Sequence, residues 1–188
     1  LTHEEIVAVA DAAVGVAPMT GRMVSDFIKL MAYSGGRWGE TLRLRWADVE
    51  FARGQIHFVT DGLSKNGEAR AVDFNENLRA HLEDMATRRA PETDFVFPSP
   101  KRKPGAVDVA HAITFNKTLR EARLKAGVPD FTCHACRHHF ASMALMSKVD
   151  VGTVAEWLGH QDNGVLLAKT YAHLLGEHKA AQAKLVRF

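Results

Sequence analysis

One short segment, residues 133–139 (CHACRHH), concentrates side chains that bind metals or transfer protons. Thiolates and imidazoles are the usual ligands of zinc, but no second C-x-x-C or H-x-x-x-H lies outside the segment to complete a standard site. Plotted as a helix, the segment places its cysteines on one stripe with Phe140 and Met143, beside a polar arc. We therefore interpret Cys133 and Cys136 as buried core thiols, with a structural metal site as the alternative.

Other polar residues each have an ordinary structural interpretation when taken singly. His134 and Arg137 form an H-x-x-R pair on one helical face, and Arg37 lies three residues before a glutamate, as salt-bridge partners often do. His160 follows a glycine in the pattern of a helix C-cap. Lys65 is typical of a solvated turn lysine and Tyr171 of a core tyrosine, so none of these residues alone indicates a function.

Several chemistries are excluded by the motifs that the chain lacks. It contains no G-x-x-x-x-G-K-[ST] and no G-x-G-x-x-G, so we expect neither nucleotide hydrolysis nor a dinucleotide cofactor. Its acidic residues are scattered, without the clustered carboxylates that a two-metal nuclease needs. We therefore expect no cofactor, and any phosphoryl chemistry is expected to proceed without a metal.

The elements that must position these residues are mainly helical. Helical spacing of apolar residues alternates with a short region of period two, around an Asn-Gly hairpin turn at 66–67. This pattern predicts a mainly α fold with a small antiparallel β-sheet insert at about residues 54–74. The predicted helices are 2–14, 23–33, a short one after Arg37, 78–89, 107–126, 133–146, 151–158 and 166–184; the predicted strands are 55–60, 69–72 and 95–97.

Length and composition favour one globular domain. The chain has 188 residues, of which 46% are hydrophobic and 24% charged, with a formal net charge of +2. These values suit a packed core and allow nucleic acid as a partner without requiring it. No membrane-length apolar run and no signal peptide are visible, so we expect a cytoplasmic protein without a membrane partner. The start at Leu1, without Met, suggests a piece of a longer protein.

The order of the polar segments is more informative than any one of them. In that order they closely resemble the tyrosine recombinases, or phage integrase family, over nearly the whole chain. The segments that carry the resemblance are SGGRWGE at 34–40, LRLRWAD at 42–48, Lys65 in its hairpin, HACRH at 134–138, LGH at 158–160 and TYAH at 170–173.

The resemblance implies the catalytic-domain fold of that family, a site-specific recombinase or integrase activity, and a set of site residues. The implied catalytic residues are Arg37, Lys65, His134, Arg137, His160 and Tyr171. Tyr171 would form a covalent 3′-phosphotyrosine with double-stranded DNA, without metal or ATP. The family acts as a tetramer of full-length protomers on DNA, each with an N-terminal core-binding domain that is absent from this chain. Residues 1–188 would thus be a single catalytic domain.

Each implied role has a chemical reason. Arg37 and Arg137 are planar cations suited to bidentate contact with a phosphate, and His160 adds a donor or proton shuttle. His134 would assist Tyr171, since a phenol with a pKa near 10 is scarcely ionised at neutral pH. Lys65 would protonate the leaving 5′ oxygen. The basic loop residues Lys101, Arg102 and Lys103 are expected to contact DNA.

Two alternative functions stay open, and the chain departs from the family pattern at two places. A type IB topoisomerase would share the same chemistry, and a noncatalytic DNA-binding module with a zinc-stabilised helix would also explain the cysteines and the basic loop. The run from Gln161 to Thr170 is longer than is usual in the family, so we make no prediction of where Tyr171 rests. Gly36 stands where the family commonly has a larger residue.

Overall fold

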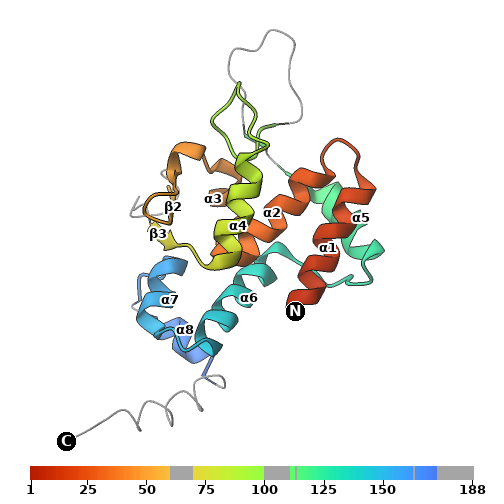
Figure 1. Cartoon of the computed structure of the whole chain (residues 1–188). Helices are drawn as coiled ribbons and strands as arrows, with labels where there is room; N and C mark the ends of the chain where they lie inside the picture. The colour runs from red at the N-terminus through yellow and green to blue at the C-terminus, as the bar shows by residue number, and fades with distance from the viewer. Residues whose placement is uncertain (60–69, 100–110, 113, 163, 173–188) are drawn as a thin grey trace, which may run out of the picture.

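The computed structural model describes residues 1–59, 70–99, 111–112, 114–162 and 164–172. Its centre is helix α2 (Gly21–Ser34), which packs against α1 (His3–Val16), α4 (Glu76–Ala86), α5 (Asn116–Lys125) and α6 (Cys133–Met146). The strands lie on the other side of α2 from α1 and α5 (Figure 1). Burial explains this central place, since apolar side chains of α2 are fully enclosed, among them Phe27, Ile28 and Leu30.

Short side-chain caps set where several helices begin. Thr2 forms a capping box with Glu5 at the start of α1, and Thr132 and Asp150 accept backbone N–H groups at the starts of α6 and α7 (Val151–Leu158). The predicted helices 133–146 and 151–158 are confirmed residue for residue. The shorter helices are α3 (Trp38–Arg43), a 3₁₀ turn η1 (Trp46–Asp48) and α8 (Val165–Thr170).

A small antiparallel sheet confirms the predicted β insert. Its strands are β1 (Val49–Glu50), β2 (Gln55–Phe58) and β3 (Arg70–Asp73), in the order β1-β2-β3. In the β2–β3 register, Ile56 lies opposite Val72 and Phe58 opposite Arg70, and all four side chains are buried. The hairpin turn at 66–67 lies outside the described residues.

The prediction of residues 95–97 as the third strand is wrong, because β1 fills that place in the sheet. Phe95 forms only a single antiparallel bridge, with Arg45. Phe97 instead packs edge-on against Phe27, with ring centroids 5.3 Å apart. A run of three apolar residues is compatible with a core loop as well as with a strand. Here the segment is a loop that buries the Phe97 side chain in the core.

The helices predicted at 2–14, 23–33 and 78–89 span His3–Val16, Gly21–Ser34 and Glu76–Ala86, and two other predicted helices differ more from the structure. The helix expected at 107–126 is confirmed for Asn116–Lys125, but residues 111–112 are extended, since the Ala112 N–H donates to the Phe97 carbonyl at 2.8 Å. The helix expected at 166–184 is confirmed up to Thr170, but it is wrong for residues 171–172, because α8 (Val165–Thr170) ends at its C-cap, Tyr171; residues 173–184 lie outside the described part. No helix of the described part is long and apolar enough to cross a membrane.

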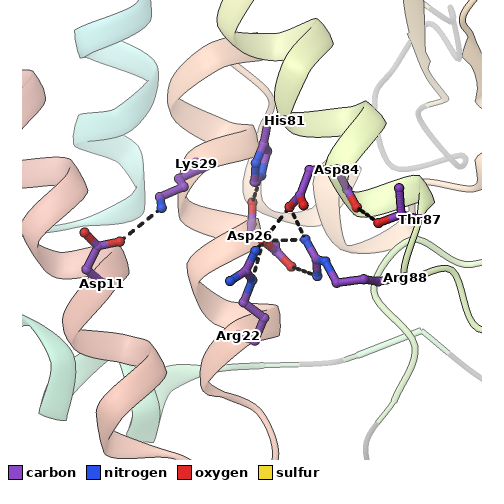
Figure 2. A network of polar contacts seen from close by, with 8 residues as sticks. All are labelled: Asp11, Arg22, Asp26, Lys29, His81, Asp84, Thr87 and Arg88. Atoms are coloured by element: carbon purple, nitrogen blue, oxygen red, sulfur yellow. Dashed lines mark hydrogen bonds and ion pairs between the residues drawn. The ribbon is translucent and has the colours of Figure 1, made fainter.

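A network of ion pairs fastens α4 to α2 (Figure 2). The Asp26 carboxylate, whose side chain is only 7% exposed, accepts hydrogen bonds from both Nη atoms of Arg88, at 2.8 and 3.4 Å. Asp84 accepts from Arg22 and Arg88, and the imidazole of His81 lies 3.0 Å from the Asp26 carbonyl oxygen. These contacts hold the helix that follows the sheet against the helix that precedes Arg37.

The end of α2 requires glycine at two positions. Gly35 has φ +65° and its N–H donates to the Met31 carbonyl, which terminates the helix. At Gly36 a Cβ would lie 2.5 Å from Thr41 Oγ1 and 2.9 Å from the Phe58 ring. The space that a larger residue would need is therefore filled by Thr41 of α3 and Phe58 of β2, which accounts for the glycine at this position.

Candidate active site

Arg37 occupies the N-cap of α3 and is clamped by a glutamate one turn later. Its Nη1 donates to Glu40 Oε1 at 2.7 Å, and its backbone N–H donates to Oε2 at 3.0 Å. Its Nη2 donates to the carbonyl oxygen of Gly159, at 3.0 Å. The Arg37 side chain is 45% exposed whereas that of Glu40 is 3% exposed. The buried Glu40 carboxylate therefore fixes the Arg37 guanidinium, which stays partly open to solvent.

Glu40 holds a second cation, Arg70, at the start of β3. Arg70 Nη2 donates to Glu40 Oε2 at 2.6 Å, and Nη1 donates to the Trp157 carbonyl oxygen. Burial raises the pKa of the Glu40 carboxyl, but the charge of Arg70 and the hydrogen bonds from Arg37 outweigh burial and lower it below its ordinary value. Glu40 is therefore an anion shared by two arginines.

Arg137 reaches the same place from α6. Its Nη1 donates to the Gly35 carbonyl at 2.8 Å and its Nη2 to the Leu158 carbonyl at 2.5 Å. Burial, with the nearby charges of Arg70 and Arg37, lowers the pKa of its guanidinium to about 9, so the group still carries its charge at neutral pH. Two carbonyls thus hold one cation between the end of α2 and the end of α7.

His160 stands just beyond the glycine that ends α7. Gly159 has φ +65°, and the His160 N–H donates to the Ala155 carbonyl at 2.9 Å, so the C-cap predicted there is confirmed. Its Nδ1 is buried without a hydrogen-bond partner in the described part of the chain. Burial and the charge of Arg137 lower the pKa of the imidazole, so it is neutral at pH 7.

Tyr171 is buried at the C-cap of α8, with its backbone N–H bonded to the Leu167 carbonyl. Its hydroxyl lies 2.6 Å from Nδ1 of His138 on α6. Burial raises the pKa of the phenol, while the charge of Arg137 acts to lower it. His134, one turn earlier and exposed, packs edge-on against His138 with ring centroids 4.6 Å apart. The imidazole that contacts the phenol is therefore that of His138.

The prediction of buried core thiols on α6 is confirmed for Cys136, which is fully buried, whereas Cys133 is half-buried and packs against the core. Burial raises the pKa of the Cys133 thiol to about 12. Met143, which the helical plot places on the same stripe, is 46% exposed, so this stripe leaves the core before the end of the helix. Within the described ranges, no three His, Cys, Asp or Glu side chains are grouped so that they could hold a metal ion.

The structure thus brings together five of the six predicted catalytic residues. Arg37, Arg137 and His160 surround the turn that ends α7, and Tyr171 and His134 lie at the neighbouring face of α6. Lys65 and the basic residues Lys101, Arg102 and Lys103 lie outside the described residues.

Three residues of this cluster are not predicted from the sequence as site residues: Glu40, Arg70 and His138. The sequence indicates only an ordinary salt bridge for Glu40, and His138 lies one turn after His134 on the same helical face. Arg70 could have been noticed from strand alternation, since it stands two positions before Val72 on the inward face of β3.

Comparison with known proteins shows to which family the chain belongs. A family model described as "Phage integrase family" matches residues 1–178. The tyrosine recombinase XerA of Pyrococcus furiosus is 29% identical over 134 residues, which are 71% of this chain and 45% of that protein. The chain spans about half the length of the curated relatives that it matches first.

Two solved structures have the same fold. The catalytic domain of bacteriophage HP1 integrase matches with a TM-score of 0.66 at 21% identity, covering 98% of this chain and 92% of that one. A post-cleavage complex of the XerH site-specific recombinase with a palindromic difH substrate matches with a TM-score of 0.67 at 21% identity, covering 97% of this chain and 52% of that one. Because the family model covers nearly the whole chain, the chain belongs to the phage integrase family of tyrosine recombinases.

Proposed function

We propose that residues 1–188 form the catalytic domain of a site-specific DNA recombinase or integrase, with Tyr171 as its nucleophile. The observation that carries the proposal is the convergence of Arg37, Arg137 and His160 on the turn after α7, from segments far apart in the sequence. The match over nearly the full length of an integrase catalytic domain supports the assignment of the whole chain to one domain.

In the proposed reaction, the Tyr171 oxygen attacks a phosphodiester of double-stranded DNA. The P–O5′ bond breaks as the P–O(Tyr) bond forms, leaving a 3′-phosphotyrosine and a free 5′-hydroxyl. Arg37 and Arg137 offset the negative charge that grows on the nonbridging oxygens, where fixed cations lower the barrier most. His160 adds a hydrogen-bond donor beside them.

Two protons must move in this step. The phenol of Tyr171 loses one as it attacks, and the hydroxyl's contact with His138 Nδ1 makes the α6 histidine pair, His134 and His138, the candidate acceptor. The leaving 5′ oxygen gains one, which we assign to Lys65. Rejoining reverses both transfers, so the energy of the broken bond is kept in the phosphotyrosine.

DNA contact and assembly complete the proposal. We propose that Lys101, Arg102 and Lys103 touch the DNA backbone, and that full-length protomers assemble as a tetramer on DNA. The XerH complex, a recombinase bound to its substrate, supports DNA as the partner. The charge of the basic loop supports backbone contact, because neutralised phosphates release counterions.

Covalent capture tests the function. The protein is incubated with nicked duplexes that carry a randomised core, in EDTA, then denatured; bound DNA is sequenced and the modified peptide identified by mass spectrometry. We expect an adduct on the peptide with Tyr171, and none in Tyr171→Phe. An adduct on another residue would overturn the nucleophile. Relaxation of supercoiled DNA without strand exchange between duplexes would favour a topoisomerase. A metal assay on the purified protein, before EDTA is added, tests the noncatalytic module, which one zinc per chain together with no adduct would favour.

A further inference from the structure

Arg70 is an arginine on the inward face of the sheet. Its side chain is only 8% exposed, and its guanidinium carbon lies 4.6 Å from the centroid of the Phe58 ring. Arg37 by contrast is 45% exposed. A phosphate that reaches Arg37 is therefore kept away from Arg70, and the buried cation must act on its protein neighbours.

Those neighbours belong to two separate parts of the site. Arg70 Nη2 donates to the carboxylate of Glu40, which clamps Arg37. Arg70 Nη1 donates to the carbonyl of Trp157, three residues before His160. A Cβ on Gly159 would lie 2.6 Å from Arg70 Cδ, so the side chain also lies directly under the turn. One guanidinium thus connects β3 to the clamp and to the end of α7.

The orientation of Arg37 depends on how Glu40 divides its charge between two arginines. Glu40 is a buried anion with two cation partners, and its carboxylate divides its hydrogen bonds between them. If Arg70 were lost, Arg37 would be the remaining cation of this clamp, because a buried carboxylate needs a partner. The exposed guanidinium would then be drawn down onto Glu40 and away from its orientation beside Gly159.

We propose that Arg70 is a positioning residue, which by sharing Glu40 and holding the Trp157 carbonyl keeps Arg37 and the His160 turn in the geometry that cleavage requires. This inference rests on the proposed function. Displacing a positioned group by about 1 Å can cost about 100-fold in rate. Arg70 would therefore control the chemical step without touching DNA.

The experiment measures single-turnover adduct formation at saturating DNA, with a duplex selected by the covalent capture described above, and separately the Kd for that duplex. Arg70→Gln should slow adduct formation about 100-fold with little change in Kd. In an Arg37→Ala background, Arg70→Gln should add little, because residues that act through one another are not additive. An equal loss in both backgrounds, or no loss in either, would overturn the inference.

Two further variants separate positioning from folding. Arg70→Gln combined with Glu40→Gln removes both buried charges, so no unpaired carboxylate remains. If this double variant melts near the wild-type temperature, slow cleavage supports positioning of Arg37 by the Arg70–Glu40 pair, and wild-type cleavage contradicts it. Should it also be unstable, Arg70→Lys, which keeps the charge beside Glu40 but cannot also hold the Trp157 carbonyl, must still slow adduct formation, by less than Arg70→Gln does.

Arg88→Gln is the matched control. It breaks another arginine pair with a buried carboxylate, Asp26, on the α4 side of the core. It should lower the melting temperature but leave adduct formation unchanged below that temperature. If Arg88→Gln slows cleavage as much as Arg70→Gln does, the effect is general destabilisation and the inference fails. If the wild-type protein forms no adduct at all, the proposed function fails instead.

Discussion

The hydroxyl of Tyr171 lies 2.6 Å from Nδ1 of His138, on the helix that also carries Arg137. Burial, with the charges of His134 and Arg137, lowers the pKa of His138, so its ring is neutral at pH 7 and can accept a proton. Burial raises the pKa of Tyr171, so the phenol needs an acceptor. The pair therefore has the protonation states that the proposed attack on a phosphate requires.

His138→Ala should slow adduct formation by about 10²–10⁴-fold, the usual contribution of a positioned base. In the wild type, the rate should fall as the pH drops through the pKa of His138, which burial holds below its ordinary value, because the protonated ring cannot accept the phenolic proton. His138→Ala should lose this acid limb. A pH–rate profile of both proteins checks it, with His134→Ala as the comparison; a larger defect in His134→Ala would show that the phenol shifts partner when DNA binds.

Arg137→Lys should lose far more cleavage than DNA binding. The guanidinium is held by two carbonyls, of Gly35 and Leu158, and a lysine cannot reproduce both contacts while facing a phosphate. Loss of one fixed donor at the transition state typically costs about 10²–10³-fold. Adduct kinetics and Kd measured on the same duplex check this. Equal losses of cleavage rate and of DNA affinity would mean that Arg137 only binds the DNA.

Much of the fold could be predicted because its determinants are local. Thr132 and Asp150 are short polar caps, and Gly159 permits a left-handed residue, so the bounds of α6 and α7 are encoded within a few residues. Phe97 was misassigned because an apolar triplet does not reveal whether its partner is a strand or a core.

The candidate site was predictable only in part, for the same reason. Arg37, Arg137 and His160 are carried by recognisable segments. Arg70 has no such segment; its role depends on which face of β3 meets Glu40, and that contact joins residues 30 positions apart. Contacts of this kind arise from tertiary packing and leave little trace in a single sequence.

Gly159→Ala should impair cleavage beyond its effect on stability. An alanine at φ +65° costs about 1–2 kcal/mol, and its Cβ would also lie 2.6 Å from Arg70 Cδ. Gly127→Ala is a matched control, because Gly127 has φ +72° but nothing within 4 Å of its Cβ position. Thermal melts should show a loss of stability in both variants, larger in Gly159→Ala because of the contact with Arg70. Adduct formation, measured below both melting temperatures, should fall only in Gly159→Ala. Equal cleavage by the two variants would show that Arg70 can move away from the new methyl group without affecting the site.

Asp26→Asn should destabilise the domain without affecting the chemistry. It removes charge-assisted hydrogen bonds to Arg88 at a side chain only 7% exposed, a loss of about 2 kcal/mol. For a domain of this size, the melting temperature should fall by roughly 4–8 °C. Asp84→Asn, at a carboxylate 53% exposed in the same network, should cost less than about 1 kcal/mol. If Asp84→Asn melts at a lower temperature than Asp26→Asn, the buried Asp26–Arg88 pair makes no net contribution to stability.

Lys65→Ala should be severely slowed on ordinary DNA and largely restored on a substrate with sulfur at the 5′ bridging position. An alkoxide is a poor leaving group and must be protonated as its bond to phosphorus breaks. A thiolate, with a pKa near 8.5, leaves without that proton. The rate ratio between the sulfur and oxygen substrates should therefore rise sharply in Lys65→Ala relative to the wild type.

Tyr171→Phe provides the control for this comparison, because an easier leaving group cannot replace a missing nucleophile. It should form no adduct with either substrate. If Lys65→Ala is impaired equally on oxygen and sulfur, Lys65 is a DNA contact rather than the acid. The proton would then have to come from a histidine, and His160, whose Nδ1 is buried without a partner in the described part of the chain, is the first to test. In that case His160→Ala, and not Lys65→Ala, should be the variant that the sulfur substrate restores.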